Sequence, residues 1–272
     1  MSLFISSLNS GSNGNCYYVG NETDAILVDA GISCREIEKR IKRLGLHIQK
    51  VKAVFISHEH SDHIRGLEVL SKKFRLPVYI TDATLSSTGF SIEKDLVRTF
   101  TAHERITIGQ MSVTAFPKFH DATDPYSFVV SCNEINVGVF TDIGQPCNEV
   151  IRYFKSCHAA FLEANYDDEM LENGKYPYYL KKRISGERGH LSNKQALDLF
   201  KVHRPAFMSH LVLSHLSKNN NCPKLVGELF NLHAKQTKIV VASRFHETEV
   251  MEITEMMKRK YSGSFEQLSL AL

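Results

Sequence analysis

Short apolar runs rich in β-branched residues recur along the chain, and polar, often glycine-containing segments separate them. Runs of this length and composition are typical of buried β-strands. The pattern predicts strands at residues 3–8, 16–19, 25–28, 51–56, 77–80, 111–116, 127–131, 135–140, 158–162, 205–213 and 238–242.

Helical periodicity replaces this pattern at several places between the strands. Ser33 with Glu36, and Ser192 with Gln195, have the spacing of a capping box, which predicts a helix start at each serine. Another helix is expected from Pro223. A further helix is expected over residues 62–73, where apolar residues recur at helix-like spacing: Ile64, Leu67, Val69 and Leu70.

Polar side chains with catalytic or metal-binding chemistry follow many of the predicted strands. Polar residues placed at the ends of several strands form an active-site rim on a rigid scaffold. The residues in such positions are Asp29, His58, His120, Asp142, Glu163 and His215.

The most informative of these segments is Ser57-His58-Glu59-His60-Ser61-Asp62-His63. It lies on a tight connection between a predicted strand and a predicted helix, where side chains can converge on one point. Neutral imidazoles together with a carboxylate suit borderline divalent metals, zinc above all, although manganese is also tolerated. The alternative interpretation is a solvated polar loop that is rich in histidine by chance.

Composition adds few constraints. With 272 residues and 43% hydrophobic composition, the chain can bury a large core, and the lack of a Gly/Ser-rich linker favours a single domain over residues 1–272. A net charge of +3 is compatible with a polyanionic substrate but does not demonstrate one. The six cysteines form no Cys-x-x-Cys pair, and no signal peptide or membrane span is recognisable. We therefore expect a soluble, cytoplasmic protein without membrane partners.

The histidine segment resembles the signature of the metallo-β-lactamase superfamily, whose members carry two metals between two β-sheets flanked by helices. The resemblance covers essentially the whole chain, and it implies an α/β (α+β) fold of the four-layer αββα type. It also implies roles for individual residues. One metal would be bound by His58, His60 and His120, the second by Asp62, His63 and His215, with Asp142 bridging the two and Asp29 orienting the loop.

The same resemblance narrows the reaction. Superfamily members that open β-lactams usually have a cysteine where this chain has Asp142, so drug hydrolysis is not expected. Two metals can hold a nucleophilic hydroxide and polarise the oxygen under attack. Asp62 would take part in this chemistry. An aspartate bridge fits nucleases, phosphodiesterases, lactonases and thioester hydrolases.

Glu163 and His190 favour a nuclease. In the related transfer-RNA 3′-processing nucleases, a glutamate after the bridging aspartate pairs with a histidine that is thought to protonate the leaving oxygen. A carboxylate raises the basicity of its imidazole partner and fixes the ring, which suits a general acid near neutral pH. The alternative is that Glu163 caps a helix and His190 is structural.

Several longer motifs are similar to those of the WalJ/YycJ-like branch of the superfamily, which is linked to 5′-to-3′ exonuclease activity on double-stranded DNA. These motifs are Ser10-Gly11-Ser12-Asn13-Gly14-Asn15, Thr141-Asp142-Ile143-Gly144, Glu163-Ala164-Asn165-Tyr166-Asp167, Gly189-His190-Leu191-Ser192-Asn193 and the segment from His215 to Asn221. The resemblance implies that DNA, in preference to RNA, is the substrate.

Candidate substrate contacts lie in two segments. By family analogy the loop with Ser10, Ser12 and Asn15 would line the site, and small residues with two glycines can turn backbone N–H groups toward a phosphate, although such a loop is also an ordinary hairpin turn. Lys181 and Arg188 precede His190 and are candidates for phosphate contacts or are simply solvated charges.

Two other function classes remain open. A small-molecule phosphodiesterase, lactonase or thioester hydrolase would use the same metal ligands. A protein that keeps the fold only to bind partners would usually have lost some ligands, whereas every expected position is filled here.

Overall fold

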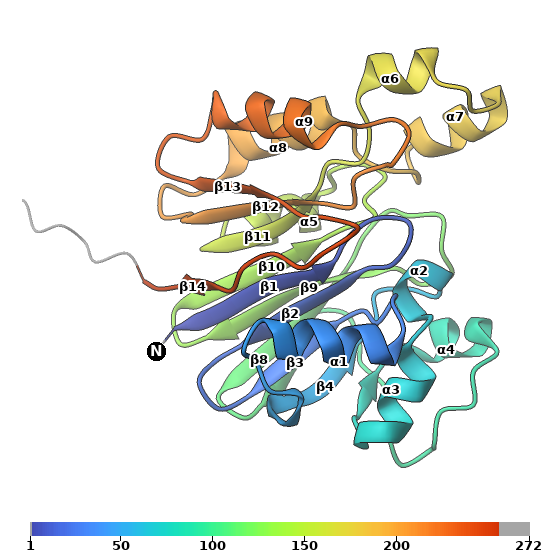
Figure 1. Ribbon diagram of the computed structural model, residues 1–272, viewed down its shortest axis with the longest axis vertical. Coiled ribbons are helices and arrows are strands. Elements are labelled where there is room, and N and C mark those ends of the chain that lie inside the picture. Colours follow the sequence, from blue (N-terminus) through green and yellow to red (C-terminus); the bar gives the residue numbers. More distant parts are fainter. Residues whose placement is uncertain (1, 256–272) are drawn as a thin grey trace, which may run out of the picture.

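The computed structural model describes residues 2–255 and contains two β-sheets packed face to face, with helices on both outer surfaces (Figure 1). The strand order of the first sheet is β14 (Met251–Ile253), β1 (Leu3–Asn9), β2 (Cys16–Gly20), β3 (Ala25–Val28), β4 (Val51–Phe55), β5 (Val78–Tyr79) and β6 (Val97–Arg98). The order of the second is β13 (Lys238–Val241), β12 (His210–Ser214), β11 (Ala159–Glu163), β10 (Ile135–Phe140), β9 (Tyr126–Cys132), β8 (Met111–Pro117) and β7 (Arg105–Ile108).

Helices from the two halves of the chain cover the two sheets separately. The first sheet is flanked by α1 (Cys34–Arg43), η1 (Ile48–Lys50), α2 (Ser61–Ile64), α3 (Leu67–Phe74) and α4 (Asp82–Thr88). The second is flanked by α5 (Asn148–Phe154), α8 (Asn193–His203) and α9 (Pro223–Asn231). Two further helices, α6 (Asp168–Asn173) and α7 (Tyr178–Ser185), stand out from this layer (Figure 1).

The buried apolar side chains fall into three clusters that match the three interfaces of a four-layer structure. One cluster fills the space between the sheets and includes Phe55 and Phe128. A second joins the second sheet to α5, α8 and α9, and a third joins the first sheet to α1 and α3. Since each layer buries its apolar face against the next, the predicted αββα architecture is confirmed.

Strand direction explains why the polar residues at strand ends meet. Strands β3, β4, β5 and β6 run parallel to one another, and so do β10, β11, β12 and β13. Ligands of parallel α/β sheets bind outside the carboxyl ends of the strands. Asp29, His58, Asp142, Glu163 and His215 therefore come from the same edge of the paired sheets.

One predicted helix is interrupted in the structure. The segment over residues 62–73 forms α2 and α3, which are separated at Arg65 and Gly66. The Gly66 N–H donates to the Ala30 carbonyl at 2.8 Å, and a Cβ at Gly66 would lie 2.0 Å from the Ile32 carbonyl oxygen. This close approach to the neighbouring backbone breaks the helix. Val69, expected on the apolar face, is 61% exposed.

Other differences are smaller. The strand expected over residues 205–213 begins only at His210, because the preceding residues form a turn in which the Met208 N–H donates to the Pro205 carbonyl. The capping box at Ser192 and Gln195 is confirmed. All six cysteines are free and at least partly buried. Residues 2–255 contain no helix long and apolar enough to cross a bilayer, and the basic run at residues 258–260, to which we assign no role, lies outside the described residues.

Candidate metal centre

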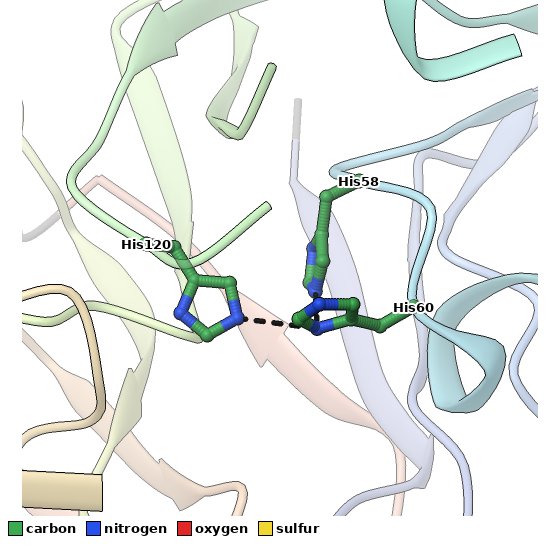
Figure 2. A group of neighbouring side chains, drawn as sticks. All are labelled: His58, His60 and His120. Atoms are coloured by element: carbon green, nitrogen blue, oxygen red, sulfur yellow. Dashed lines mark hydrogen bonds between the residues drawn. The ribbon is translucent and has the colours of Figure 1, made fainter. Parts of the chain in front are cut away.

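Three histidines from two loops converge at the carboxyl edge of the sheets. His58 and His60 come from the loop after β4, and His120 comes from the loop after β8. Figure 2 shows the three rings pointing toward one another. His58 Nε2 lies 3.1 Å from His60 Nδ1, and His120 Nε2 lies 3.3 Å from the same His60 atom.

These distances fit a shared metal ion. Two ligand nitrogens at about 2.0–2.1 Å from a tetrahedral zinc ion lie about 3.3 Å apart. The other nitrogens of two of the rings are already used, because His120 Nδ1 donates to the Gly189 carbonyl (3.1 Å) and His58 Nδ1 contacts Ser57 Oγ (2.8 Å). Each ring is thereby turned so that its Nε2 faces the common centre, as ligand rings usually are.

A second group forms around His63 and Asp142. Asp29 Oδ2 accepts a hydrogen bond from His63 Nδ1 (2.7 Å), and the same carboxylate accepts from the backbone and hydroxyl of Ser57 (2.8 and 2.9 Å). His63 Nε2 then lies 3.2 Å from Asp142 Oδ2. Asp29 thus orients the His63 ring and ties it to the loop that carries His58, which is the geometry expected of a residue that supports metal ligands.

Asp62 and His215 lie at the edge of this second group. His215 Nε2 is 3.7 Å from Asp62 Oδ2, while His215 Nδ1 contacts Asp142 Oδ2 at 2.8 Å. His63 Nε2 lies 3.6 Å from Asp62 Oδ2. The structure therefore brings together all seven residues expected to bind metal, with His215 closer to Asp142 than to Asp62. Imidazole nitrogens and carboxylate oxygens in this arrangement suit a divalent cation.

The backbone at three of these positions is left-handed. Asp29, Asp142 and His215 have φ angles of 62°, 54° and 55°, and each lies one or two residues beyond a strand end. Non-glycine residues in this region are uncommon, and they cluster where function holds a side chain in place. Beyond this turn the three side chains contact the same group of residues, since Asp29 contacts His63 and both His63 and His215 contact Asp142.

Glu163 and His190 form a pair beside this group. His190 Nδ1 donates to Glu163 Oε1 at 2.7 Å. The other carboxylate oxygen accepts backbone N–H bonds from Ile143 (2.7 Å) and Leu191 (3.2 Å). Glu163 is fully buried, whereas the His190 side chain is 20% exposed. The carboxylate is therefore fixed in place, and the far side of the imidazole is left for a reacting group.

Electrostatics distinguish these histidines. Burial lowers the pKa of His120 to about 2, so the ring is neutral and able to bind metal at physiological pH. Burial would also lower the pKa of His190, but attraction to Glu163, the hydrogen bond between them and the charge of Asp142 raise it to about 9. His190 is accordingly protonated at neutral pH. Burial of Asp142 is outweighed by His215 and His63, which hold its pKa well below the usual value.

The predicted substrate loop is mostly structural. Ser10 is buried, and its Oγ accepts the His215 N–H at 2.7 Å. Asn15 is fully buried, and its Nδ2 contacts Asp62 Oδ2 (3.2 Å) and His63 Nε2 (3.1 Å). Both side chains are used to hold candidate metal ligands, and their contact with substrate stays a prediction. Ser12 is exposed at the tip of the loop.

The two basic candidates lie on the surface. Lys181, in α7, donates from Nζ to the Glu172 carbonyl, which holds it against its own hairpin of helices. Arg188 is exposed in the turn between α7 and His190. Contact of either residue with phosphate stays a prediction.

Sequence reasoning missed Ser57 and Lys118. The Ser57 hydroxyl contacts Asp29, His58 and His63. Lys118 is buried, and its Nζ donates to the Thr141 carbonyl at 2.7 Å, directly before Asp142. Strand alternation could have revealed it, since Lys118 has the same parity as the buried Phe116.

Comparison with known proteins identifies the family of the chain. The family model described as a beta-lactamase superfamily domain matches residues 24–216. The chain is 34% identical over 257 residues to the exodeoxyribonuclease YycJ of Bacillus anthracis, covering 88% of this chain and 97% of the relative. It is 30% identical over 223 residues to the exodeoxyribonuclease WalJ of Streptococcus pneumoniae, covering 80% of this chain and 83% of the relative.

Solved structures with the same fold are more distant in sequence. The metallo-β-lactamase fold protein YhfI of Bacillus subtilis superposes with a TM-score of 0.72 at 17% identity, covering 92% of this chain and 99% of that one. The short form of human tRNase Z has a TM-score of 0.62 at 18% identity, covering 91% and 99%. Together with the family match and the two relatives above, the fold shows that the chain belongs to the metallo-β-lactamase superfamily of metal-dependent hydrolases, in its YycJ/WalJ-like branch.

Proposed function

We propose that the protein is a metal-dependent nuclease that removes nucleotides from the end of double-stranded DNA in the 5′-to-3′ direction. The observation that carries the proposal is the Glu163–His190 pair, with 2.7 Å between Oε1 and Nδ1, placed 3.8 Å from Asp142. The names of the YycJ and WalJ relatives, both exodeoxyribonucleases, support DNA as the substrate.

The donor set fits two divalent cations, with zinc favoured over manganese because nitrogen ligands predominate. One ion would be held by His58, His60 and His120. The other would be held by Asp62, His63 and His215, whose Nε2 atoms lie 3.6 and 3.7 Å from Asp62 Oδ2, with Asp142 between the two sites. When bound, a pair of divalent ions makes a water nucleophilic near neutral pH and neutralises charge that develops on the phosphoryl oxygens.

The protein's own residues supply the proton for the leaving group. Cleavage breaks a P–O bond as an oxygen from water joins the phosphorus, and the departing oxygen needs a proton. His190 carries that proton on Nε2, because its Nδ1–H is bonded to Glu163. After transfer, the neutral imidazole stays bonded to the carboxylate and recovers a proton from solvent. General acid catalysis of this kind contributes about 10²–10⁴-fold.

The helix α7 offers a surface for the DNA backbone. None of its eight residues is buried, and Tyr178 and Tyr179 are 73% and 74% exposed. The Lys182 ammonium lies 5.5 Å from the Tyr178 ring, and Arg183 pairs with Asp121, the neighbour of His120, at 2.5 Å. Exposed aromatic and basic side chains next to a catalytic centre suit binding of a polyanion.

The six free cysteines support the expected reducing, cytoplasmic location.

The test is cleavage of duplex DNA labelled at either end, using metal-reconstituted wild type, His63→Ala and His190→Ala. We expect release of labelled mononucleotide first from the 5′ end, loss of activity in both variants, and metal content retained only in His190→Ala. Turnover of a small phosphodiester, lactone or thioester without cleavage of DNA or RNA would contradict the proposal and favour a small-molecule hydrolase.

A further inference from the structure

A cavity of about 400 Å³ lies beside the metal centre and has no part in the chemistry described above. Its walls come from the loop after β1, the segment after β12, the start of α9 and the segment after β13. Cavities of this size accommodate small organic ligands. Its position next to a candidate nuclease centre raises the question of which part of a substrate it would take.

One wall is shared with the candidate metal ligands. Ser10 lines the cavity, and its hydroxyl accepts the backbone N–H of His215 at 2.7 Å. Leu216, the next residue, also lines it, and the Leu216 carbonyl accepts from Arg244 Nη2 at 2.8 Å. A ligand in this cavity would therefore contact Leu216, the residue that follows His215 in the chain.

The lining carries positive charge and no carboxylate. Lys218 and Arg244 both contribute, accompanied by the hydroxyl-bearing Ser217 and Ser243, and neither Asp nor Glu occurs among the described residues of the lining. This lining attracts anions, and its ammonium, guanidinium and hydroxyl groups can donate hydrogen bonds to a phosphate. Arg244 is held at its guanidinium by Leu216, so part of this charge is already oriented.

Phe245 adds a flat apolar surface to the same lining. Phe245 is 71% exposed, so its ring is accessible to a ligand from solvent. The backbone beneath it is nevertheless fixed, because the Phe245 carbonyl accepts from Arg40 Nη2 (3.0 Å) and its N–H donates to Ser243 Oγ (3.1 Å). Arg40 is itself buried and bonded to the Leu8 carbonyl (2.7 Å). The ring is thus presented to solvent on a well-anchored loop.

We propose that this cavity, together with Phe245, binds a nucleoside monophosphate unit, with the phosphate near Lys218 and Arg244 and the base stacked on Phe245. The inference rests on the proposed nuclease function and deepens it. Two sources supply this chemistry: the terminal nucleotide of the DNA strand and the mononucleotide that cleavage releases. A site for the terminal nucleotide would favour cutting at ends.

Binding of deoxyadenosine monophosphate and of deoxyadenosine to metal-loaded protein tests the site directly. Base–aromatic stacking is worth about 1–3 kcal/mol by alanine substitution, so Phe245→Ala should weaken both ligands about tenfold or more. Lys218→Ala should weaken only the phosphate-bearing ligand. The matched controls are Leu232→Ala, another exposed apolar side chain (81% exposed), and Lys201→Ala on α8. Equal affinities in all variants would overturn the proposal.

Kinetics on duplex DNA separate the two sources. If the terminal nucleotide occupies the cavity, Phe245→Ala and Lys218→Ala raise KM for linear DNA, and Lys218→Ala reduces the preference for a 5′-phosphorylated end over a 5′-hydroxyl end. If only the product binds, KM is unchanged and inhibition by deoxyadenosine monophosphate weakens.

The failure of this inference differs from that of the proposed function. If DNA cleavage depends on His190 but mononucleotide affinity does not depend on Phe245 or Lys218, only the nucleotide site is contradicted. If mononucleotide binding depends on both residues but DNA is not cleaved, the nuclease function is contradicted and the nucleotide site is supported.

Discussion

The Glu163 carboxylate accepts a hydrogen bond from His190 Nδ1 at 2.7 Å while its second oxygen is held by the backbone N–H groups of Ile143 and Leu191. Glu163 and Ile143 lie at the carboxyl ends of the neighbouring strands β11 and β10, whereas His190 and Leu191 come from the segment between α7 and α8. The pair is therefore rigid before any substrate arrives, and it keeps His190 both oriented and charged. An acid prepared in this way avoids the cost of reorganisation during the reaction.

Removing the charge of Glu163 should move the alkaline limb of the pH–rate profile. A general acid works only while protonated, so activity falls as pH rises through the pKa of His190, which Glu163 and Asp142 raise to about 9 against the effect of burial. Glu163→Gln keeps the size of the side chain but not the charge. The pKa of His190 then falls, and the alkaline limb shifts to lower pH. The measurement is kcat against pH at saturating substrate.

A fall in kcat without a shift of that limb would mean that Glu163 only holds the local backbone. Metal content should be equal in both proteins, because Glu163 is not among the expected ligands.

Asp29→Asn should weaken metal binding without preventing folding. Asparagine tolerates the left-handed backbone at this position (φ 62°) but cannot match the charged acceptor that orients His63. Residues that support metal ligands typically contribute 10–100-fold to affinity. Metal affinity, measured by competition with a chelator, should fall by about that factor. Asp198→Asn on the exposed face of α8 is the matched control, and equal affinities in the two variants would contradict the role of Asp29.

Gly31→Ala should destabilise the protein and disturb the metal-binding loop together. A Cβ at Gly31 would lie 1.7 Å from the Asp62 carbonyl oxygen and 2.5 Å from the Asn15 nitrogen, both of them backbone atoms. Forced repacking costs about 1–3 kcal/mol. The midpoint of thermal unfolding and the metal content of the purified protein should both fall. In Gly227→Ala, where the nearest atom is a Val241 methyl group at 3.3 Å, we expect neither effect.

Lys182→Ala should reduce the salt dependence of DNA binding. Each phosphate neutralised by a lysine contributes about one to the slope of log affinity against log salt concentration. If α7 contacts the DNA backbone, the slope should become shallower by about one in a binding assay with catalytically inactive His190→Ala protein. Lys201→Ala on α8 should leave the slope unchanged. An unchanged slope in the Lys182→Ala protein would contradict contact between Lys182 and the DNA backbone.

The sequence was most informative where chemistry and strand pattern coincide. His58, His60 and His63 follow a clear buried strand, so their convergence could be expected, and the strand ends placed Asp29, Glu163 and His215 on the same edge. It was least informative where the local structure depends on contacts with backbone atoms that are distant in the sequence.

The break at Gly66 depends on the Ala30 and Ile32 carbonyls. The short strand β14 forms only by pairing with β1. Asn15 could not be recognised as a support for Asp62, because that contact joins a loop to the helix α2, 47 residues further along the chain.

The central claim is that His190 protonates the leaving oxygen of a phosphodiester, and the most direct measurement is the effect of His190→Ala on two substrates of different leaving-group acidity. Duplex DNA has a poor leaving group that needs a proton, whereas a p-nitrophenyl ester of thymidine monophosphate does not. With metal content equal to wild type, the variant should lose about 10²–10⁴-fold in kcat on DNA and little on the nitrophenyl ester. Equal losses on both substrates would contradict the account.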